Sequence, residues 1–321
     1  MDMKHCLLRR LLGLVPLLLG ISFLSFVLIQ LSPGDPAEVV IRVNDMTPTP
    51  ELLAEVRTQL GLDRPFPERY LRWLADVLRG DLGMSYVNGR PVAGELARAL
   101  PPTLMLAGTA AAIMLVCSLA VALVCVRHEG RVVDRLLRAL LFLGTSVPAF
   151  WAGLLLIWLF SVHLDWLPTG GLEGPSSLVL PAVTLALPYL AAYARLLRNS
   201  MVQTAQEDFV LYARACGRSR GAILHMVLRN SLQASLTALG MSLPKLVAGS
   251  FVVECIFAWP GLGRLCVTAI FNRDLPVIQA YVLLMAVLFV AGNLCMDFVR
   301  ACWTRVCVNG GCDEVRTGIA A

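Results

Sequence analysis

The chain has 321 residues, of which 57% are hydrophobic and 15% are charged, and its mean hydropathy is +0.72. A soluble core needs far less apolar surface, so this composition excludes an ordinary soluble protein and indicates a polytopic membrane protein. The net charge of +5 is small and is concentrated in a few loops. That pattern is typical of membrane topology and excludes a nucleic-acid-binding surface.

The apolar stretches predict six membrane-spanning helices, because one span needs about 20 apolar residues. The first stretch follows Lys4, Arg9 and Arg10. It is too long for a signal peptide and lacks a small-residue cleavage site, so we expect it to be retained. Pro181 and Pro188 interrupt the fourth stretch, which membrane helices tolerate. The expected spans are 11–31, 103–126, 137–160, 178–197, 235–256 and 277–299.

The polar segment 32–102 predicts a small helical lobe after the first span. One helix is expected from Pro50 to Gly61 with Thr49 as its N-cap, and a second from Pro67 to Gly80. Apolar residues recur at helical spacing in both. They are Leu52, Leu53, Val56 and Leu60 in the first helix, and Tyr70, Leu71, Leu74, Val77 and Leu78 in the second.

Basic residues in short loops predict the orientation, because such loops face the cytoplasm. Loops 127–135 and 198–233 are rich in arginine, whereas 161–177 contains Asp165 and Glu173 and no Lys or Arg. We therefore expect the two arginine-rich loops and both termini inside, and the lobe outside.

The cytoplasmic loop between spans four and five, residues 203–230, has the character of a docking element. Small alanines permit close backbone approach, a glycine permits a sharp turn, and two aromatic side chains can anchor in a groove of a soluble partner. An amphipathic helix on the membrane surface is the alternative interpretation. The candidate docking residues are Glu207, Asp208, Phe209, Tyr212, Ala213, Arg214, Ala215 and Gly217.

Motifs along nearly the whole chain identify a resemblance. They are Leu31–Ala37, Leu60–Pro65, Gly80–Ser85, Pro148–Trp151, the docking segment Glu207–Ser219, Glu254–Arg264 and Arg273–Pro276. In order and spacing they resemble ABC-importer permeases of the dipeptide, oligopeptide and nickel group. The segments Thr47–Glu51, Ile256–Gly261 and Ala269–Asp274 are most similar to the first permease subunit of nickel importers.

The resemblance implies a type I ABC-importer permease fold in a bacterial inner membrane. It implies an N-terminal helix and lobe (1–94), a permease domain (95–300) and a cytoplasmic tail (301–321). The docking segment would be the coupling helix that contacts an ATPase subunit. A family motif, assigned to a gate, would comprise Glu254, Pro260, Gly261, Gly263, Arg273 and Asp274.

The implied partners are a second homologous permease, two ATPase subunits, an extracytoplasmic substrate-binding protein and membrane lipid. The chain has no G-x-x-x-x-G-K-[ST] phosphate loop, so ATP and Mg²⁺ are expected to be used by the partner subunits, with no cofactor bound by this chain. It also has no H-E-x-x-H pair and no evident nucleophile with a base at helical spacing, which argues against a membrane enzyme. An autonomous channel or secondary transporter is the alternative from another class.

Two charges in or near span five stand out, because an intramembrane charge is costly and is a functional candidate by default. At about 100° per residue, Lys245 and Glu254 lie on opposite helix faces and cannot pair with each other. Glu254 is assigned to a gate or loop-orienting role. Lys245 is either a pathway residue or a side chain that snorkels into a wet cavity.

The expected substrate is nickel, and we expect it to cross as a chelate. A bare Ni²⁺ path needs converging imidazole, thiolate or carboxylate ligands, but none of His5, His128, His163 and His225 lies deep in a span. Cys302, Cys307 and Cys312 lack the spacing typical of a metal site, so no metal site is predicted. The alternative substrates are a dipeptide, an oligopeptide or a metal-opine complex.

Overall fold

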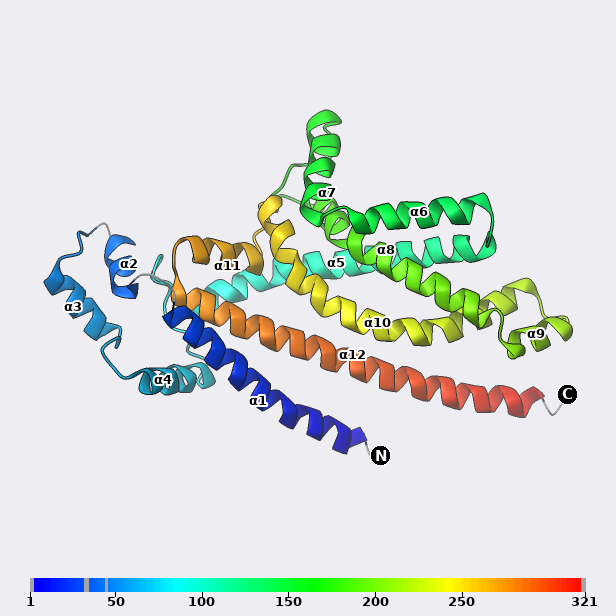
Figure 1. The fold of residues 1–321 in the computed structure, drawn as a ribbon, viewed down its shortest axis with the longest axis horizontal. Helices are drawn as coiled ribbons and strands as arrows, with labels where there is room; N and C mark the ends of the chain where they lie inside the picture. The colour runs from blue at the N-terminus through cyan, green and yellow to red at the C-terminus, as the bar shows by residue number, and fades with distance from the viewer. Residues whose placement is uncertain (1–2, 32–34, 44–45, 319–321) are drawn as a thin grey trace. The chain divides into compact units, whose positions relative to one another are not determined.

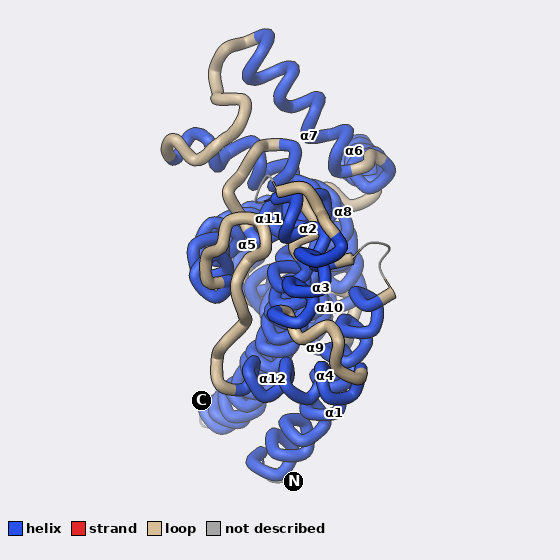
Figure 2. The backbone as a smooth tube through the Cα atoms, turned by 90° about the vertical axis from the view of Figure 1, so that its left-hand side faces the viewer, coloured by secondary structure: helices blue, strands red, loops and turns tan. Residues whose placement is uncertain are grey.

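The computed structural model describes the backbone of residues 3–31, 35–43 and 46–318. It describes the side chains of 14–28, 31, 35–43, 46–232, 235, 242, 244–296 and 298–299. Within these ranges the regular secondary structure is helical, apart from one isolated antiparallel bridge between Met84 and Pro91. Figure 2 shows helices and their connecting loops. The prediction of an all-α fold is confirmed.

Twelve α-helices, one π-helix and one 3₁₀-helix follow one another along these described residues (Figure 1). They are α1 (Met3–Gln30), α2 (Pro36–Val43), α3 (Pro50–Gln59), α4 (Phe66–Leu78), α5 (Val92–Arg127), α6 (Val132–Ser146), α7 (Ala149–Leu156), the π-helix Ile157–His163, the 3₁₀-helix Pro175–Leu178, α8 (Val179–Thr204), α9 (Asp208–Ala215), α10 (Arg220–Ile256), α11 (Leu262–Phe271) and α12 (Leu275–Gly318).

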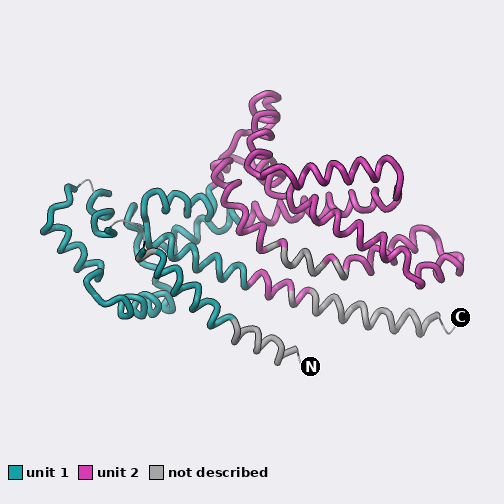
Figure 3. The backbone as a smooth tube through the Cα atoms, in the orientation of Figure 1, with its two compact units in different colours: residues 1–103, 260–290 teal, residues 104–259, 291–321 magenta. Residues whose placement is uncertain are grey.

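The chain divides into two compact units, which Figure 3 distinguishes. Unit 1 contains residues 1–103 and 260–290, and unit 2 contains residues 104–259 and 291–321. The sequence predicts domain boundaries at 94/95 and 300/301. The division into two units does not test these boundaries, which stay a prediction. Helix α12 continues through the second of them to Gly318.

In unit 1, helices α2, α3 and α4 and the loop that follows to Pro91 form the lobe. The Thr49 side chain accepts a hydrogen bond from the Leu52 backbone N–H at 3.4 Å, and Gly61 adopts φ +64° just after α3. Both ends of this helix lie where the sequence predicts them. Its apolar face packs on α2, a helix that was not predicted, around the buried side chains of Ala37, Ile41 and Val56.

The predicted second lobe helix, α4, packs through its aromatic residues. Tyr70 and Trp73 form edge-to-face or tilted contacts with Phe26 of α1, with ring centroids 5.5 and 5.7 Å apart. Leu71 and Leu78, which recur at helical spacing with Tyr70, do not pack with it, because their side chains are 62% and 80% exposed. The aromatic contacts fix the rotation of the helix about its axis, and that rotation turns these two leucines outward.

Unit 2 is built around α8, which packs against α6, α7 and α10 (Figure 1). Its buried face includes small residues such as Ala182, Ala186 and Ala194, which let the neighbouring helices approach closely. Pro188 lies inside α8 without ending it, and Pro181 lies in its first turn, so the weak fourth span is one continuous helix.

Three described helices are long and apolar enough to cross a membrane, namely those at Val92–Arg127, Pro175–Thr204 and Leu275–Met296. The pair Val132–Ser146 and Ala149–His163 makes a fourth candidate, but it is bent by 104°. The expected spans 11–31 and 235–256 fall on α1 and α10, where several side chains lie outside the described residues. Those two spans stay predictions.

The prediction of one continuous third span at 137–160 is wrong, because the helix breaks between Ser146 and Ala149. Pro148 lacks a backbone N–H, and its ring disfavours a helical conformation of the preceding residue. Val147 accordingly takes φ −84° and ψ 124°. The proline of the Pro148–Trp151 motif therefore marks a sharp bend.

Candidate functional site: the coupling segment and the motif loops

Helix α9 forms a separate short helix between α8 and α10, in the middle of the loop that the sequence singles out. Glu207 precedes it in an extended conformation, and Asp208 and Arg214 lie in its first and last turns, where their charges complement the helix dipole. Gly217 adopts φ +73° in the turn that follows. The Ser219 hydroxyl then accepts a hydrogen bond from the Ala222 N–H at 3.3 Å and starts α10.

The two faces of α9 differ sharply. Val210 is fully buried in a cluster that includes Leu197 and Met201 of α8 and Val227 of α10, and Ala213 is 6% exposed. On the other face Phe209 is 40% and Tyr212 is 73% exposed. The remaining candidate docking residues, Glu207, Asp208, Arg214, Ala215 and Gly217, are exposed as well. Val210 thus anchors α9 to its own unit and Ala213 is buried, whereas Phe209 and Tyr212 are accessible to a partner.

Glu254 lies in the last turn of α10 and is completely buried. Its Oε1 accepts a hydrogen bond from the Ser250 hydroxyl at 2.9 Å, one turn earlier on the same helix. Directly after it the chain turns tightly, with the Trp259 N–H donating to the Glu254 carbonyl at 2.8 Å and Ala258 at φ +49°. The buried carboxylate therefore lies next to the tight turn in which α10 ends.

The turn after α10 is clamped by the loop 168–171 of the same unit. The Gly171 N–H donates to the Phe257 carbonyl at 2.8 Å, and a Cβ atom on Gly170 would collide with that carbonyl. Phe257 and Trp259 are fully buried. The motif Glu254–Arg264 is thus positioned by packing and by backbone hydrogen bonds, which a spacing argument does not reveal.

Two distant sequence motifs meet at Asp274 in unit 1. Asp274 is 4% exposed, and its Oδ2 accepts a short hydrogen bond from the Ser85 hydroxyl, while its Oδ1 accepts one from the Tyr86 N–H at 3.0 Å. Burial and then the Asp274 carboxylate raise the pKa of the Tyr86 phenol, and Arg69 opposes this shift. Sequence reasoning missed Ser85 and Tyr86 as partners, although it singled out the motif that ends at Ser85.

The other motif residues surround α11. Pro260 is exposed, and Gly261 and Gly263 are buried at the start of α11, where the Leu262 N–H donates to the Thr103 hydroxyl at 2.8 Å. Arg273 is exposed and adopts φ +57° after α11 ends. Asp274 and these residues therefore share one unit.

Lys245 lies mid-helix on α10 and is exposed, in contrast to the buried Glu254. Its backbone carbonyl accepts a hydrogen bond from the Tyr189 hydroxyl of α8 at 3.0 Å. Among the residues with described positions, no three His, Cys, Asp or Glu side chains are grouped to hold a metal ion. The side chains of Cys302, Cys307 and Cys312 lie outside the described ones.

A buried ion pair in unit 2 was not predicted at all. Asp134, at the start of α6, is fully buried, and its two carboxylate oxygens accept hydrogen bonds from Arg198 of α8 at 3.2 and 3.0 Å. Arg138 lies 3.5 Å from the same carboxylate. Sequence reasoning used Arg198 only as a topology signal, because the spacing of distant residues cannot show a pair.

Family models cover most of the chain. The model described as "Binding-protein-dependent transport system inner membrane component" matches residues 114–302, and its N-terminal companion matches residues 3–107. The chain therefore belongs to the family of binding-protein-dependent inner-membrane transport components. It is an ABC-importer permease of the peptide and nickel group and a multi-pass inner-membrane protein, not an enzyme. This class replaces the alternative of an autonomous channel or secondary transporter.

Relatives of known function match almost end to end. The chain is 38% identical over 297 residues to the metal-staphylopine import system permease protein CntB of Staphylococcus aureus, covering 92% of this chain and 95% of the relative. It is 40% identical over 300 residues to the glutathione transport system permease protein GsiC of Salmonella paratyphi A, covering 93% and 97%.

A solved structure shows the same fold. The inward-facing methionine ABC transporter MetNI matches with a TM-score of 0.55 and 19% identity, over 65% of this chain and 95% of that chain. An amino acid ABC transporter matches with a TM-score of 0.50 and 18% identity, over 66% and 94%. At this identity the likeness concerns the fold, and it confirms the type I permease fold.

Proposed function

We propose that this permease imports a chelated metal, with nickel as the first candidate. The observation that carries the proposal is the 38% identity over 92% of the chain to a permease of a metal-staphylopine import system. The similarity of segments 256–261 and 269–274 to the first subunit of nickel importers supports nickel as the metal.

The complete transporter in this proposal contains a second homologous permease, two ATPase subunits and an extracytoplasmic substrate-binding protein. ATP and Mg²⁺ act on the ATPase subunits, and this chain binds no cofactor. Both of its termini face the cytoplasm, which places α9 on the same side as the ATPases. The exposed aromatic side chains of α9, Phe209 and Tyr212, support a docking role for that helix.

The proposed mechanism is alternating access between two states, with ATP and the loaded binding protein each favouring one of them. Closure of the ATPase pair would move α9, and the buried Val210 would transmit that movement to α8 and α10. Glu254 is assigned the gate or loop-orienting role because it is buried at the end of α10, and Lys245 the role of a pathway residue. Unchanged transport by a Lys245→Met variant would remove the second assignment.

A peptide is the second candidate substrate. The observation that favours a peptide is the 40% identity to a glutathione transport permease, beside the 38% identity to the metal-chelate relative. The chain itself performs no covalent chemistry in either case. The choice between the two candidates therefore rests on transport measurements.

Uptake of ⁶³Ni²⁺ into cells with and without the gene tests the proposal, in the presence of histidine as chelator and with dipeptides or glutathione as competitors. If nickel uptake is lost without the gene, and if peptides do not compete with that uptake in cells that carry the gene, the metal assignment is supported. Stimulation of nickel uptake by histidine supports transport of the chelate. Normal nickel uptake with loss of peptide accumulation would overturn it in favour of the second candidate.

A further inference from the structure

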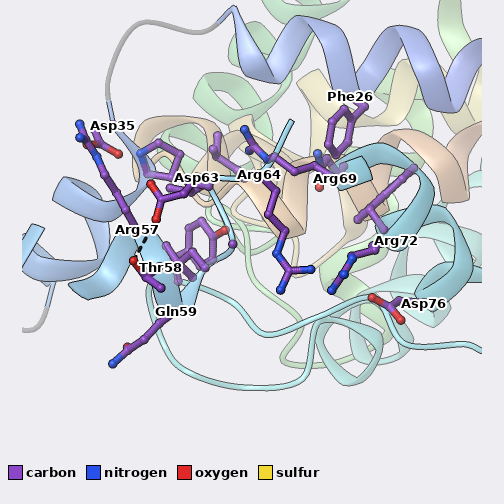
Figure 4. Close-up of a pocket in the computed structure, with 18 residues that line it drawn as sticks. Phe26, Asp35, Arg57, Thr58, Gln59, Asp63, Arg64, Arg69, Arg72 and Asp76 are labelled. Atoms are coloured by element: carbon purple, nitrogen blue, oxygen red, sulfur yellow. Dashed lines mark hydrogen bonds and ion pairs between the residues drawn. The ribbon is translucent and has the colours of Figure 1, made fainter. Parts of the chain in front are cut away.

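A half-open cavity of about 880 Å³ lies in unit 1 between the lobe and residues of α1 and α12, and its volume is within the range of small-molecule sites (Figure 4). Its lining comes from α3, α4, the connection between them, Asp35 and Pro36 at the start of α2, Phe26 of α1, Tyr86, and the first turns of α12. No motif of the sequence analysis assigns a role to this space. Its size and enclosure by several elements suit a small solute better than a flat protein surface.

Four arginines line the cavity, and three of them have a carboxylate partner. Arg57 lies 2.6 Å from Asp35, and Arg64 and Arg72 share Glu68 at 3.4 and 2.9 Å. Arg64 and Arg72 thus have one carboxylate, Glu68, between them. The lining also contains Asp35, Asp63 and Asp76, so the arginines are balanced in charge and differ in how each one is paired.

Arg69 is the fourth arginine and differs from the others. It lies on α4, is half-buried, and has no ion pair or side-chain hydrogen bond among the residues with described side chains. A partly desolvated guanidinium group without an acceptor is unfavourable, because it loses water without gaining a partner. Figure 4 shows Arg69 beside Phe26 at the edge of the cavity.

The wall around Arg69 is preformed. Phe26 and Trp73 belong to the aromatic cluster of α1 and α4, with ring centroids 5.7 Å apart. Tyr86 is held in place through its backbone N–H, which donates to Asp274 at 3.0 Å. Such a rigid wall lowers the entropic cost of binding a ligand.

Acidic residues also line the cavity, and they are engaged elsewhere. The Asp63 carboxylate accepts a hydrogen bond from the Thr58 hydroxyl at 2.9 Å, and Asp76 lies 3.8 Å from Arg79. Neither is paired with Arg69. An incoming anion thus meets one guanidinium group that no carboxylate of the described lobe already occupies.

We propose that the lobe cavity binds a small solute through its carboxylate, with Arg69 as the main donor and Phe26 and Trp73 contacting the apolar part. A guanidinium group binds a carboxylate through two parallel hydrogen bonds, which gives directional recognition. The proposal holds for either candidate substrate and concerns a site of the permease itself.

Equilibrium dialysis of the full chain in lipid nanodiscs, without any binding protein, tests the site with two radiolabelled probes. Glycylglycine carries a carboxylate, and glycylglycinamide differs in carrying an amide there. We expect saturable binding of glycylglycine and binding of the amide that is about tenfold weaker or more, since charged hydrogen bonds are roughly twice as strong as neutral ones. Equal binding of the two probes would overturn the proposal, as would no saturable glycylglycine binding at about 10 mM.

Variants localise the binding. Arg69→Gln should weaken glycylglycine binding about tenfold or more, and Arg69→Lys, which keeps the charge but loses the planar fork, should weaken it less. Arg42→Gln is the matched control, because it removes one positive charge from an exposed residue of the lobe, and neither Arg42 nor its partner Glu38 lines the cavity. Size-exclusion profiles verify that each variant is folded. Unchanged affinity of a folded Arg69→Gln variant would sink the proposal, and so would an equal loss in Arg42→Gln.

Discussion

Asp274 and Arg214 are both charged residues of recognisable motifs, but their surroundings are opposite. Asp274 is 4% exposed and accepts two hydrogen bonds from a loop that is distant in the sequence. Arg214 is exposed on α9, as are the side chains of Phe209 and Tyr212 on the same helix. A motif residue of the first kind holds the molecule together, and one of the second kind is available to a partner. The two kinds should separate when stability and transport are measured on the same variants.

The largest loss of stability is expected for Asp134→Ala, a buried residue outside the motifs. The substitution leaves Arg198, whose side chain is 14% exposed, without its carboxylate, and breaking a buried pair in this way costs about 3–5 kcal/mol. Thermal or denaturant unfolding in detergent measures the loss. Glu129→Ala, at an exposed acidic residue just before α6, is the control and should change stability by less than about 0.5 kcal/mol. Similar losses in the two variants would contradict the structural role of the ion pair.

A smaller loss of stability, about 2 kcal/mol, is expected for Asp274→Asn. The amide still accepts one hydrogen bond, but it loses the charge that strengthens the bonds from Ser85 and Tyr86. Unfolding of the purified chain gives the free energy. Asp76→Asn removes an exposed carboxylate of the lobe that makes only a 3.8 Å ion pair, so it should be almost neutral. If Asp274→Asn proved equally neutral, the bonds to Asp274 would not fasten the loop.

Next in size is the exposed helix cap of α3. Thr49→Ala removes the acceptor of the 3.4 Å bond from the Leu52 N–H and should cost about 1 kcal/mol or less. Thr47→Ala, on an exposed threonine two residues earlier and outside any helix, is the matched control. Hydrogen exchange of the backbone amides in the first turn of α3 measures the effect of the lost cap at that turn. Equal exchange in both variants would show that the cap contributes nothing.

The sequence predicted best the features that depend on neighbouring residues. The cap at Thr49 and the turn at Gly61 follow from local chemistry, and the helix around Phe209 was implied by the family resemblance; the structure contains all three. The bend at Pro148 was visible as a proline, but its angle depends on how α6 and α7 each pack on α8.

Pairs between distant residues were out of reach. The bonds from Ser85 to Asp274 and from Arg198 to Asp134 join residues far apart in the sequence, and no periodicity links them. The outward positions of Leu71 and Leu78 likewise follow from the contacts of Tyr70 and Trp73 with α1. Helix period alone gives an apolar face but does not give the partner that covers it.

The smallest expected change in stability belongs to the variant with the clearest expected loss of function. Arg214→Glu places a negative charge in the last turn of α9, which costs about 0.5 kcal/mol through the helix dipole. If α9 docks on an ATPase subunit, the reversed charge should reduce the stimulation of ATP hydrolysis by loaded binding protein about tenfold, equivalent to about 1.4 kcal/mol at the interface. The measurement uses the complete transporter reconstituted in liposomes.

The control for Arg214→Glu is Arg79→Glu, which makes the same charge change on an exposed arginine of the lobe. It should leave the stimulation of ATP hydrolysis unchanged. If ATP hydrolysis is fully stimulated in Arg214→Glu, exposure on α9 does not indicate docking. Asp274 and Arg214 would then differ only in how they pack. Lost stimulation with an intact fold would instead show that the exposed motif acts on a partner, because a fold defect is excluded by the unfolding measurement on the same sample.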